Sequence, residues 1–160
     1  MNNNDVIIYT DGSSRGNPGP GGYGIVMEDC KTGFSKQYSK GFKKTTNNRM
    51  ELLAVIDALK KLKKTKLKIT VFTDSKYVVD SIEKKRVFKW KTTGFKNKKN
   101  VDLWLEFLNL QELNSISFMW IKGHNNHPQN ETCDKLAFSA SEKKPLFIDE
   151  GYEKTLNKLF

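Results

Sequence analysis

Two segments of this chain share one pattern, in which an apolar and β-branched run ends in Thr-Asp followed by a small residue. The segments are residues 6–12 (VIIYTDG) and 69–75 (ITVFTDS). Each run predicts a buried strand with an Asp, Asp11 or Asp74, at its carboxyl end. Two such strands side by side in one sheet would bring the carboxylates together, where they repel unless a cation lies between them. Since carboxylate oxygens suit hard divalent ions, the pattern predicts a metal-dependent site at a sheet edge.

The order of the expected elements predicts an α/β fold. We expect strands at Val6–Thr10, Tyr23–Glu28, Ser35–Lys40, Leu67–Thr73 and Ile116–Ile121. We expect helices at Arg49–Leu62, Lys76–Glu83, Val101–Leu110 and Glu131–Glu142, with a Gly-rich turn over residues 12–24. Strands first and strand–helix alternation afterwards predict a five-stranded mixed sheet flanked by helices. Its first three strands form an antiparallel meander, and the last two lie parallel to the first strand after right-handed crossovers.

Length and composition limit the class of protein. The chain has 160 residues, which suits one domain with a sizeable core. No apolar stretch approaches the roughly 18 residues that span a bilayer, and the first residues lack the features of a signal peptide. Cys30 and Cys133 are too few and too far apart for a disulfide framework or a CxxC metal motif. We therefore expect a cytoplasmic protein without a membrane segment.

The net charge of +10 indicates a polyanionic partner, although a Lys-rich composition for solubility would give the same total. The distribution of charge favours the partner. Between residues 84 and 99 no residue is acidic, and Phe88, Trp90 and Phe95 interleave with the basic ones. These basic residues are Lys84, Lys85, Arg86, Lys89, Lys91, Lys96, Lys98 and Lys99. This stretch, the basic flap, predicts a nucleic-acid contact in which Lys reaches phosphates and flat rings pack on sugars or bases.

Two further acids stand at positions that fit the same site. Glu51 lies near the start of one expected helix, and Asp134 lies near the start of another. Each alone is explained by the preference of acids for helix N-termini, as Asp11 and Asp74 alone are explained by turn formation. All four converging by accident is much less expected than any one of them. Four other acids lack such a placement, and we interpret them as surface charges or caps: Asp57, Asp80, Glu83 and Asp102.

Several motifs, in order along residues 6–141, carry a resemblance to a known family. They are YTDGS (9–13), GNPGPGGYG (16–24), TNNRMEL (46–52), TDS (73–75), NVDLW (100–104), WIKGH (120–124), HPQNE (127–131) and CD (133–134). Together they closely resemble bacterial-type type 1 ribonuclease H. The resemblance implies a five-stranded mixed sheet and an endonuclease that hydrolyses the RNA strand of RNA–DNA hybrids, leaving 5′-phosphate and 3′-hydroxyl ends.

The resemblance also assigns catalytic roles. Asp11, Glu51, Asp74 and Asp134 match the four carboxylates of the family, which hold two Mg²⁺ ions when substrate is bound, with Mn²⁺ as a substitute. Two such ions can activate water and stabilise a leaving oxygen. His124 matches the catalytic histidine of the family, and histidine suits proton transfer near neutral pH. Geometry must decide between this role for His124 and that of an ordinary hydrogen-bonding loop residue.

The resemblance further implies contacts with the substrate. The residues that match readers of the RNA 2′-hydroxyl are Gly12, Ser13, Ser14, Arg15, Asn17 and Glu51. Asn47 and Asn48 resemble residues that touch the minor groove of the hybrid, although both also suit plain helix capping. Lys44, Thr46 and Asn100 resemble a pocket for a DNA phosphate, which a hydroxyl, an amide and a helix start can form.

The basic flap departs from the family pattern. Trp90 matches the aromatic residue that faces the DNA strand, but the flap is shorter between Phe95 and Asn100. Arg86 and Phe95 stand where Trp is common in the family. We expect hydrolysis to survive these changes and the affinity for the hybrid to depend steeply on salt, because the flap is rich in Lys.

The chain divides into an expected catalytic domain, residues 1–144, and a C-terminal extension, residues 145–160. Tyr152, Leu156, Leu159 and Phe160 would share one face of a short helix in the extension. That face either docks on the same core or offers an apolar stripe to a replication protein. We otherwise expect a monomer whose partner is the RNA–DNA hybrid.

Two other functions remain open from the sequence. One is a non-catalytic module that binds RNA–DNA hybrids, although such a module has no need of four acids that face phosphates. The other is a different enzyme of the same superfamily, such as a DNA-strand-transfer nuclease. The GNPGPGGYG loop and the TNNRME helix start favour the hybrid ribonuclease over this second alternative.

Overall fold

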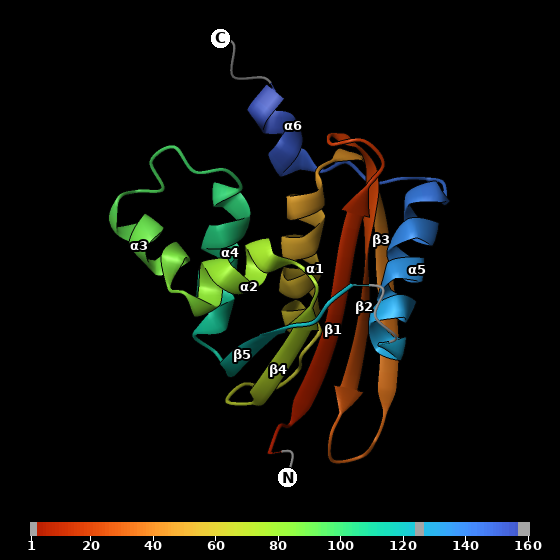
Figure 1. The fold of residues 1–160 in the computed structure, drawn as a ribbon, viewed down its shortest axis with the longest axis vertical. Helices are drawn as coiled ribbons and strands as arrows, with labels where there is room; N and C mark the ends of the chain where they lie inside the picture. Colours follow the sequence, from red (N-terminus) through yellow and green to blue (C-terminus); the bar gives the residue numbers. More distant parts are fainter. Residues whose placement is uncertain (1–2, 124–126, 157–160) are drawn as a thin grey trace.

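The computed structural model describes residues 3–123 and 127–156, which form a mixed sheet with helices on both faces (Figure 1). The strands are β1 (Val6–Ser14), β2 (Gly19–Asp29), β3 (Ser35–Thr45), β4 (Lys68–Thr73) and β5 (Ser115–Trp120). Their order across the sheet is β3-β2-β1-β4-β5. The first three strands are antiparallel, whereas β4 pairs parallel with β1 and β5 pairs parallel with β4. The predicted fold class and strand topology are confirmed.

Helices cover both faces of the sheet. Their bounds are α1 (Asn47–Lys60), α2 (Lys76–Glu83), α3 (Arg86–Thr92), α4 (Val101–Gln111), α5 (Pro128–Glu142) and α6 (Glu150–Leu156). In Figure 1, α1 lies behind the sheet and α5 lies on the other face, where it contacts β1, β2 and β3. The helix α3, inside the basic flap, was not predicted. None of the helices within the described residues is long and apolar enough to cross a bilayer.

The strand β1 is longer than the sequence predicted. It continues through Asp11 and Gly12 to Ser14, because β2 begins at Gly19 and pairs with it along this whole length. Residues 15–18 connect the two strands, and the prediction of a turn over residues 12–24 was therefore wrong for residues 12–14 and 19–24. The glycines there serve a close helix–sheet contact instead, since a Cβ at Gly24 would lie 2.3 Å from the carbonyl oxygen of Cys133 on α5.

The helix α1 is buried along most of its length and forms the centre of the core. Leu52, Val55 and Ile56 are fully buried, as expected from their helical spacing. The helix contacts β1 and β2 on one side and α4 and α2 on the other. It begins at Asn47, two residues before the predicted start, with Thr46 as its cap. Because α1 is held on all sides, the residues of its first turns have a fixed position relative to the sheet.

Candidate metal and nucleic-acid site

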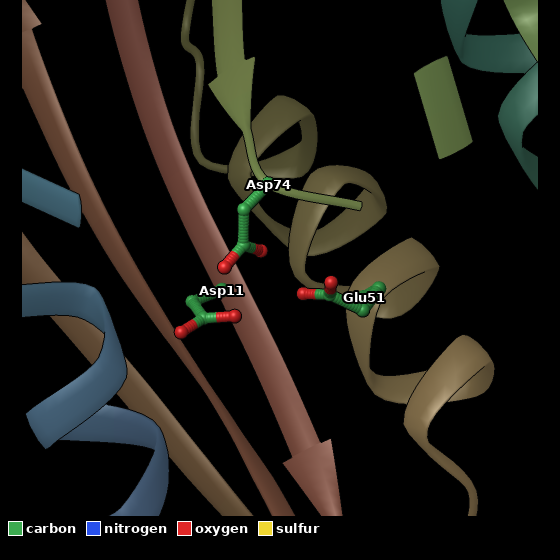
Figure 2. A group of neighbouring side chains, drawn as sticks. All are labelled: Asp11, Glu51 and Asp74. Atoms are coloured by element: carbon green, nitrogen blue, oxygen red, sulfur yellow. The ribbon is translucent and has the colours of Figure 1, made fainter. Parts of the chain in front are cut away.

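The parallel pairing of β1 and β4 brings two predicted site residues together. Thr10 and Thr73 are partners in the register, so Asp11 and Asp74 follow at neighbouring positions. Figure 2 shows these two carboxylates and that of Glu51, from α1, pointing toward one another. One carboxylate oxygen of each residue lies within 4.8 Å of those of the other two. Asp11 and Glu51 are buried and Asp74 is half-buried, so this carboxylate group is largely removed from water.

Glu51 is held in place by the backbone of β1. The N–H of Gly12 donates to Oε1 of Glu51 over 2.5 Å and to Oδ1 of Asp11 over 2.9 Å. A Cβ at Gly12 would lie 2.4 Å from the backbone carbonyl carbon of Met50, so only glycine permits this approach of α1 to β1. The N–H of one peptide group thus orients two of the three carboxylates.

Asp74 is contacted by β5 and by the residues that follow β5. Nε1 of Trp120, the last residue of β5, donates to the backbone carbonyl oxygen of Asp74 over 3.1 Å. Ser75 caps α2 by accepting a hydrogen bond from the N–H of Val78. A Cβ at Gly123 would lie 2.6 Å from Oδ2 of Asp74. The backbone after β5 therefore passes directly over this carboxylate.

Asp134, the fourth predicted carboxylate, lies half-buried on α5. It is not a member of the mutually close group found in the described part of the chain, which contains Asp11, Glu51 and Asp74. It is nevertheless close enough to Asp11 for its charge and side chain to raise the pKa of that residue. The structure thus brings three predicted carboxylates into one group and places the fourth beside it.

The electrostatics of the group favour a bound cation. Burial, reinforced by the charge of Asp74, raises the pKa of Asp11 to about 8. Burial and the neighbouring Asp11 also raise the pKa of Glu51 well above its ordinary range, and burial raises the pKa of Asp74. Each carboxylate thus resists ionising, since none of the described residues forms an ion pair with it. A divalent ion with a preference for oxygen ligands, such as Mg²⁺ or Mn²⁺, would supply the opposing charge.

A second set of hydrogen bonds joins β1, the turn after it and the start of α1 near the carboxylate group. The N–H of Ser14 donates to Oδ1 of Asn47 over 2.7 Å, and the N–H of Asn47 donates to Oδ1 of Asn17 over 3.0 Å. The side chain of Asn47 therefore ties α1 to β1 and does not cap the helix, a role that Thr46 fills. Asn48 is exposed, as a residue that contacts a ligand would be. The predicted substrate contacts of these residues stay predictions.

The comparisons with known proteins identify the family. The family model for RNase H matches residues 3–142, most of the chain. The chain belongs to the ribonuclease H family. Curated ribonucleases H that resemble it include that of Desulforamulus reducens, 49% identical over 150 residues that cover 91% of this chain and 92% of that protein. That of Nitratidesulfovibrio vulgaris is 45% identical over 157 residues, covering 95% of this chain and 99% of that protein.

Solved structures agree with this assignment. LC9-RNase H1, described as a type 1 RNase H with the type 2 active-site motif, superposes with a TM-score of 0.76 at 30% identity, covering 99% of this chain and 83% of that chain. LC11-RNase H1 in complex with an RNA/DNA hybrid gives a TM-score of 0.62 at 28% identity, covering 84% of this chain and 95% of that chain. The predicted resemblance to type 1 ribonuclease H is confirmed.

In this ribonuclease H, the basic flap presents its cations to solvent. All eight of its basic residues are exposed, and within the described ranges only Lys84 forms an ion pair, with Asp80 at 3.6 Å. The aromatic residues instead attach the flap to the core. Phe95 is 6% exposed and belongs to the core, so the interpretation of its ring as a contact for sugars or bases was wrong. Trp90 is half-buried against Trp104, and its contact with DNA stays a prediction.

The residues predicted to bind a DNA phosphate lie at the starts of two helices. Thr46 is the cap of α1, and the exposed Lys44 precedes it at the end of β3. Asn100 occupies the cap position of α4, where its Nδ2 donates to the hydroxyl oxygen of Tyr77 over 3.0 Å. The hydroxyl of Tyr77 also accepts from Nε1 of Trp104 over 2.8 Å. Asn100 is therefore fixed to the core through Tyr77.

No local pattern in the sequence predicts the ion cluster around the buried Arg49, which lies next to these residues. Arg49, only 3% exposed, pairs with Asp149 in the extension and with Asp102 on α4. Partial burial alone would raise the pKa of Asp102, but hydrogen bonds from Arg49 outweigh that effect and lower the pKa. Asp102 is therefore more than the surface charge or cap that we expected. The partners are 100 and 53 positions apart, beyond any local pattern.

The C-terminal extension docks through the segment before its helix. The backbone of Phe147 pairs with that of Phe42, through hydrogen bonds with Lys43 and Gly41 of 2.8 and 2.9 Å. In contrast, α6 has no buried residue between its bounds, and Leu156 is 41% exposed. Tyr152 is half-buried and α6 contacts β3, whereas Leu156 points to solvent, so docking of the apolar face is not seen for Leu156. The choice between docking and a partner surface stays a prediction. Leu159 and Phe160 lie outside the described residues, as does His124.

Proposed function

We propose that this ribonuclease H is an endonuclease that hydrolyses the RNA strand of RNA–DNA hybrids by two-metal-ion catalysis. The observation that carries the proposal is the mutually close group of Asp11, Glu51 and Asp74 in a chain of this family. The products would carry 5′-phosphate and 3′-hydroxyl ends. The carboxylates come from a single chain, which supports action as a monomer.

The residues that would hold the metal are Asp11, Glu51, Asp74 and Asp134. Their oxygens offer only hard ligands. The raised pKa values of Asp11, Glu51 and Asp74 support a bound cation, because no described residue forms an ion pair with these three carboxylates. When bound, two Mg²⁺ ions would supply activation of the attacking water and stabilisation of the leaving 3′-oxygen. We propose Mg²⁺ as the usual ion and Mn²⁺ as a substitute.

The protein's own groups supply orientation around this centre. The N–H of Gly12 fixes Glu51, and the burial of the group limits access of bulk water. Ser14 is two positions after Gly12 on β1 and is hydrogen-bonded to Asn47, which is bonded in turn to Asn17. These three residues form one surface near the carboxylate group. We propose that this surface reads the RNA strand through its 2′-hydroxyls, the feature that distinguishes RNA from DNA. LC11-RNase H1, a neighbour in structure, was solved with an RNA/DNA hybrid.

The exposed cations of the basic flap support binding of the hybrid's phosphates. Seven of its basic residues have no carboxylate partner among the described residues and are free to neutralise phosphates. We propose that the flap tracks the DNA strand, with Trp90 as its ring contact. His124 would transfer a proton to or from the reacting groups.

A cleavage assay with matched variants tests the function. An RNA–DNA hybrid with a label on the end of one strand is incubated with the protein in Mg²⁺ and in EDTA, and each strand is labelled in turn. We expect metal-dependent cutting of the RNA strand alone, lost in Asp74→Asn. Asp80→Asn makes the same chemical change at an acid on α2 that pairs with Lys84 and is outside the carboxylate group. This variant should therefore keep full activity. Binding of the hybrid without cutting would instead support a non-catalytic binding module.

A further inference from the structure

The buried guanidinium of Arg49 joins three segments that are far apart in the sequence. On the side of the extension, its Nε and one terminal nitrogen donate to the two oxygens of Asp149 over 2.8 and 2.9 Å. On the side of α4, its two terminal nitrogens donate to the two oxygens of Asp102 over 2.8 and 2.7 Å. A planar guanidinium bound in this way to two carboxylates fixes both the distance and the angle between its partners.

Each of these ion pairs lies next to a residue that the resemblance assigns to a pocket for a DNA phosphate. This phosphate pocket consists of Lys44, Thr46 and Asn100. The backbone N–H of Arg49 donates to Oγ1 of Thr46 over 3.3 Å. Asp102 is two positions after Asn100, in the first turn of the same helix. Asp149 also accepts a hydrogen bond of 2.6 Å from Oγ1 of Thr45, which adjoins Lys44.

We propose that Asp149, acting through Arg49 and Thr45, is a positioning residue for this phosphate pocket. The proposal rests on the proposed function, which supplies the phosphate. A phosphate held by groups from β3, α1 and α4 binds well only when the three elements keep one spacing. The side chain of Asp149 is 6% exposed and contacts Thr45 at the end of β3 and Arg49 on α1. Arg49 in turn pairs with Asp102 on α4. The docked extension therefore sets the geometry of the pocket.

The effect should fall on binding and leave the chemistry unchanged. The catalytic carboxylates are fixed independently, by the pairing of β1 with β4 and by the N–H of Gly12. Loosening the pocket therefore raises the Michaelis constant while the turnover number is kept. Removing Asp149 also leaves a buried cation short of a partner and lowers stability, so stability alone is not a sufficient test.

The test uses hybrids in which one DNA phosphate at a time is replaced by an uncharged methylphosphonate. In the wild-type protein, one position should raise the Michaelis constant about 10-fold, because a hydrogen bond to a charged group is lost. In Thr46→Ala that penalty should shrink, which identifies the pocket. In Asp149→Ala we expect a Michaelis constant about 5- to 10-fold higher on the unmodified hybrid, a penalty that falls to about 2-fold and an unchanged turnover number.

Two further variants separate positioning from loss of stability. Asp149→Asn keeps one oxygen for Arg49 and Thr45 and removes the charge. It therefore tests the ion pair between Asp149 and Arg49 if Asp149→Ala does not fold. Ile69→Ala removes a buried side chain from the far end of β4 and should lower the melting temperature without changing the Michaelis constant or the penalty. All assays are run well below the melting temperature of each variant.

The possible outcomes lead to different conclusions. Folded Asp149 variants that keep the wild-type Michaelis constant and the full methylphosphonate penalty would overturn the positioning role. A wild-type protein that cleaves the hybrid without a penalty at any DNA position would also overturn it, since no pocket would then be there to position. A wild-type protein that does not cleave hybrids at all would instead refute the proposed function.

Discussion

The backbone N–H of Gly12 donates to Oε1 of Glu51 over 2.5 Å, which joins the end of β1 to the start of α1 at the carboxylate group itself. The two elements are too close for a side chain at position 12, because a Cβ there would lie 2.5 Å from the backbone nitrogen of Glu51. One glycine therefore orients Glu51 through a hydrogen bond and sets the distance of its helix from the strand. This contact fixes Glu51 beside Asp11 and Asp74.

The first prediction concerns Gly12→Ala. The added methyl group must push α1 away from β1, which carries Glu51 out of the carboxylate group and lengthens its hydrogen bond. We expect turnover of an RNA–DNA hybrid to fall by about 10²-fold or more, with a loss of about 1–3 kcal/mol in the free energy of unfolding. Steady-state cleavage and chemical denaturation measure the two effects.

Gly33→Ala is the matched control for this substitution. Gly33 has a φ of +77° in the turn between β2 and β3, and a Cβ there would meet nothing within 4 Å. The change should cost about 1 kcal/mol of stability through its backbone conformation alone, with turnover unchanged. Equal losses of turnover in the two variants would show that the contact of Gly12 with α1 has no special role.

The second prediction concerns stability and pH in the presence of EDTA. Burial and the charge of Asp74 raise the pKa of Asp11 from 3.8 to about 8. Between those two pH values the folded protein keeps a proton that the unfolded chain has released, so the free energy of unfolding falls as pH rises. Asp11→Asn removes the part of this dependence that comes from Asp11 and leaves the parts that come from Glu51 and Asp74. A pKa raised by about four units corresponds to about 5 kcal/mol, so at pH 8 the variant should exceed the wild type in stability by up to about that amount.

The difference between Asp11→Asn and the wild type should shrink as pH falls toward 4, where the unfolded chain also begins to hold its proton. Thermal unfolding followed by circular dichroism across this range gives the comparison. Parallel stability curves for the two proteins would mean that Asp11 is already ionised in the folded state without a metal.

The third prediction concerns metal binding. A cation that enters the group must displace the protons that the raised pKa values of Asp11, Glu51 and Asp74 retain. The affinity for Mg²⁺ should therefore rise by up to about tenfold per pH unit below pH 8 for each proton released. Calorimetric titration in two buffers with different ionisation enthalpies measures that release. The same heat in both buffers would exclude it.

The fourth prediction concerns the two histidines of the chain. The family resemblance assigns proton transfer to His124, whereas His127 precedes Pro128, which restricts its backbone and suggests a structural role. His124→Ala should slow turnover by about 10²–10⁴-fold and leave Mg²⁺ binding intact. His127→Ala should change turnover much less. An unchanged rate in His124→Ala would remove the proposed role.

Local patterns in the sequence were enough to predict the sheet and the pairing of Asp11 with Asp74. Both residues end apolar runs, and strand periodicity together with the order of elements decides which strands are neighbours. The position of Glu51 could be expected from the start of its helix. What the sequence could not provide was the contact that holds it, since the backbone of Gly12 carries no side-chain signature of its partner.

The features that sequence reasoning missed depend on long-range packing. Phe95 stands in a basic run that predicts an exposed ring, yet it adopts a φ of +58° and turns into the core. The pairing of Arg49 with Asp149 joins residues 100 positions apart, and neither has a local pattern that names the other. Such contacts are decided by how whole elements pack, which propensity and periodicity do not encode.

The last prediction tests the basic flap through salt. Lys96 and Lys99 are exposed and lack a carboxylate partner within the described ranges, so each can neutralise a phosphate and release a counterion. Replacing both with Ala should reduce the slope of the logarithm of the Michaelis constant against that of salt concentration by about 2. The substitutions leave Val87 and Phe95, which anchor the flap, untouched. The turnover number should stay constant, because the carboxylate group is on other elements.

Lys63→Ala with Lys64→Ala is the matched control. It makes the same change in net charge at exposed positions after α1, outside the flap. If that pair reduces the slope as much as the flap pair does, overall charge and not the flap binds the hybrid.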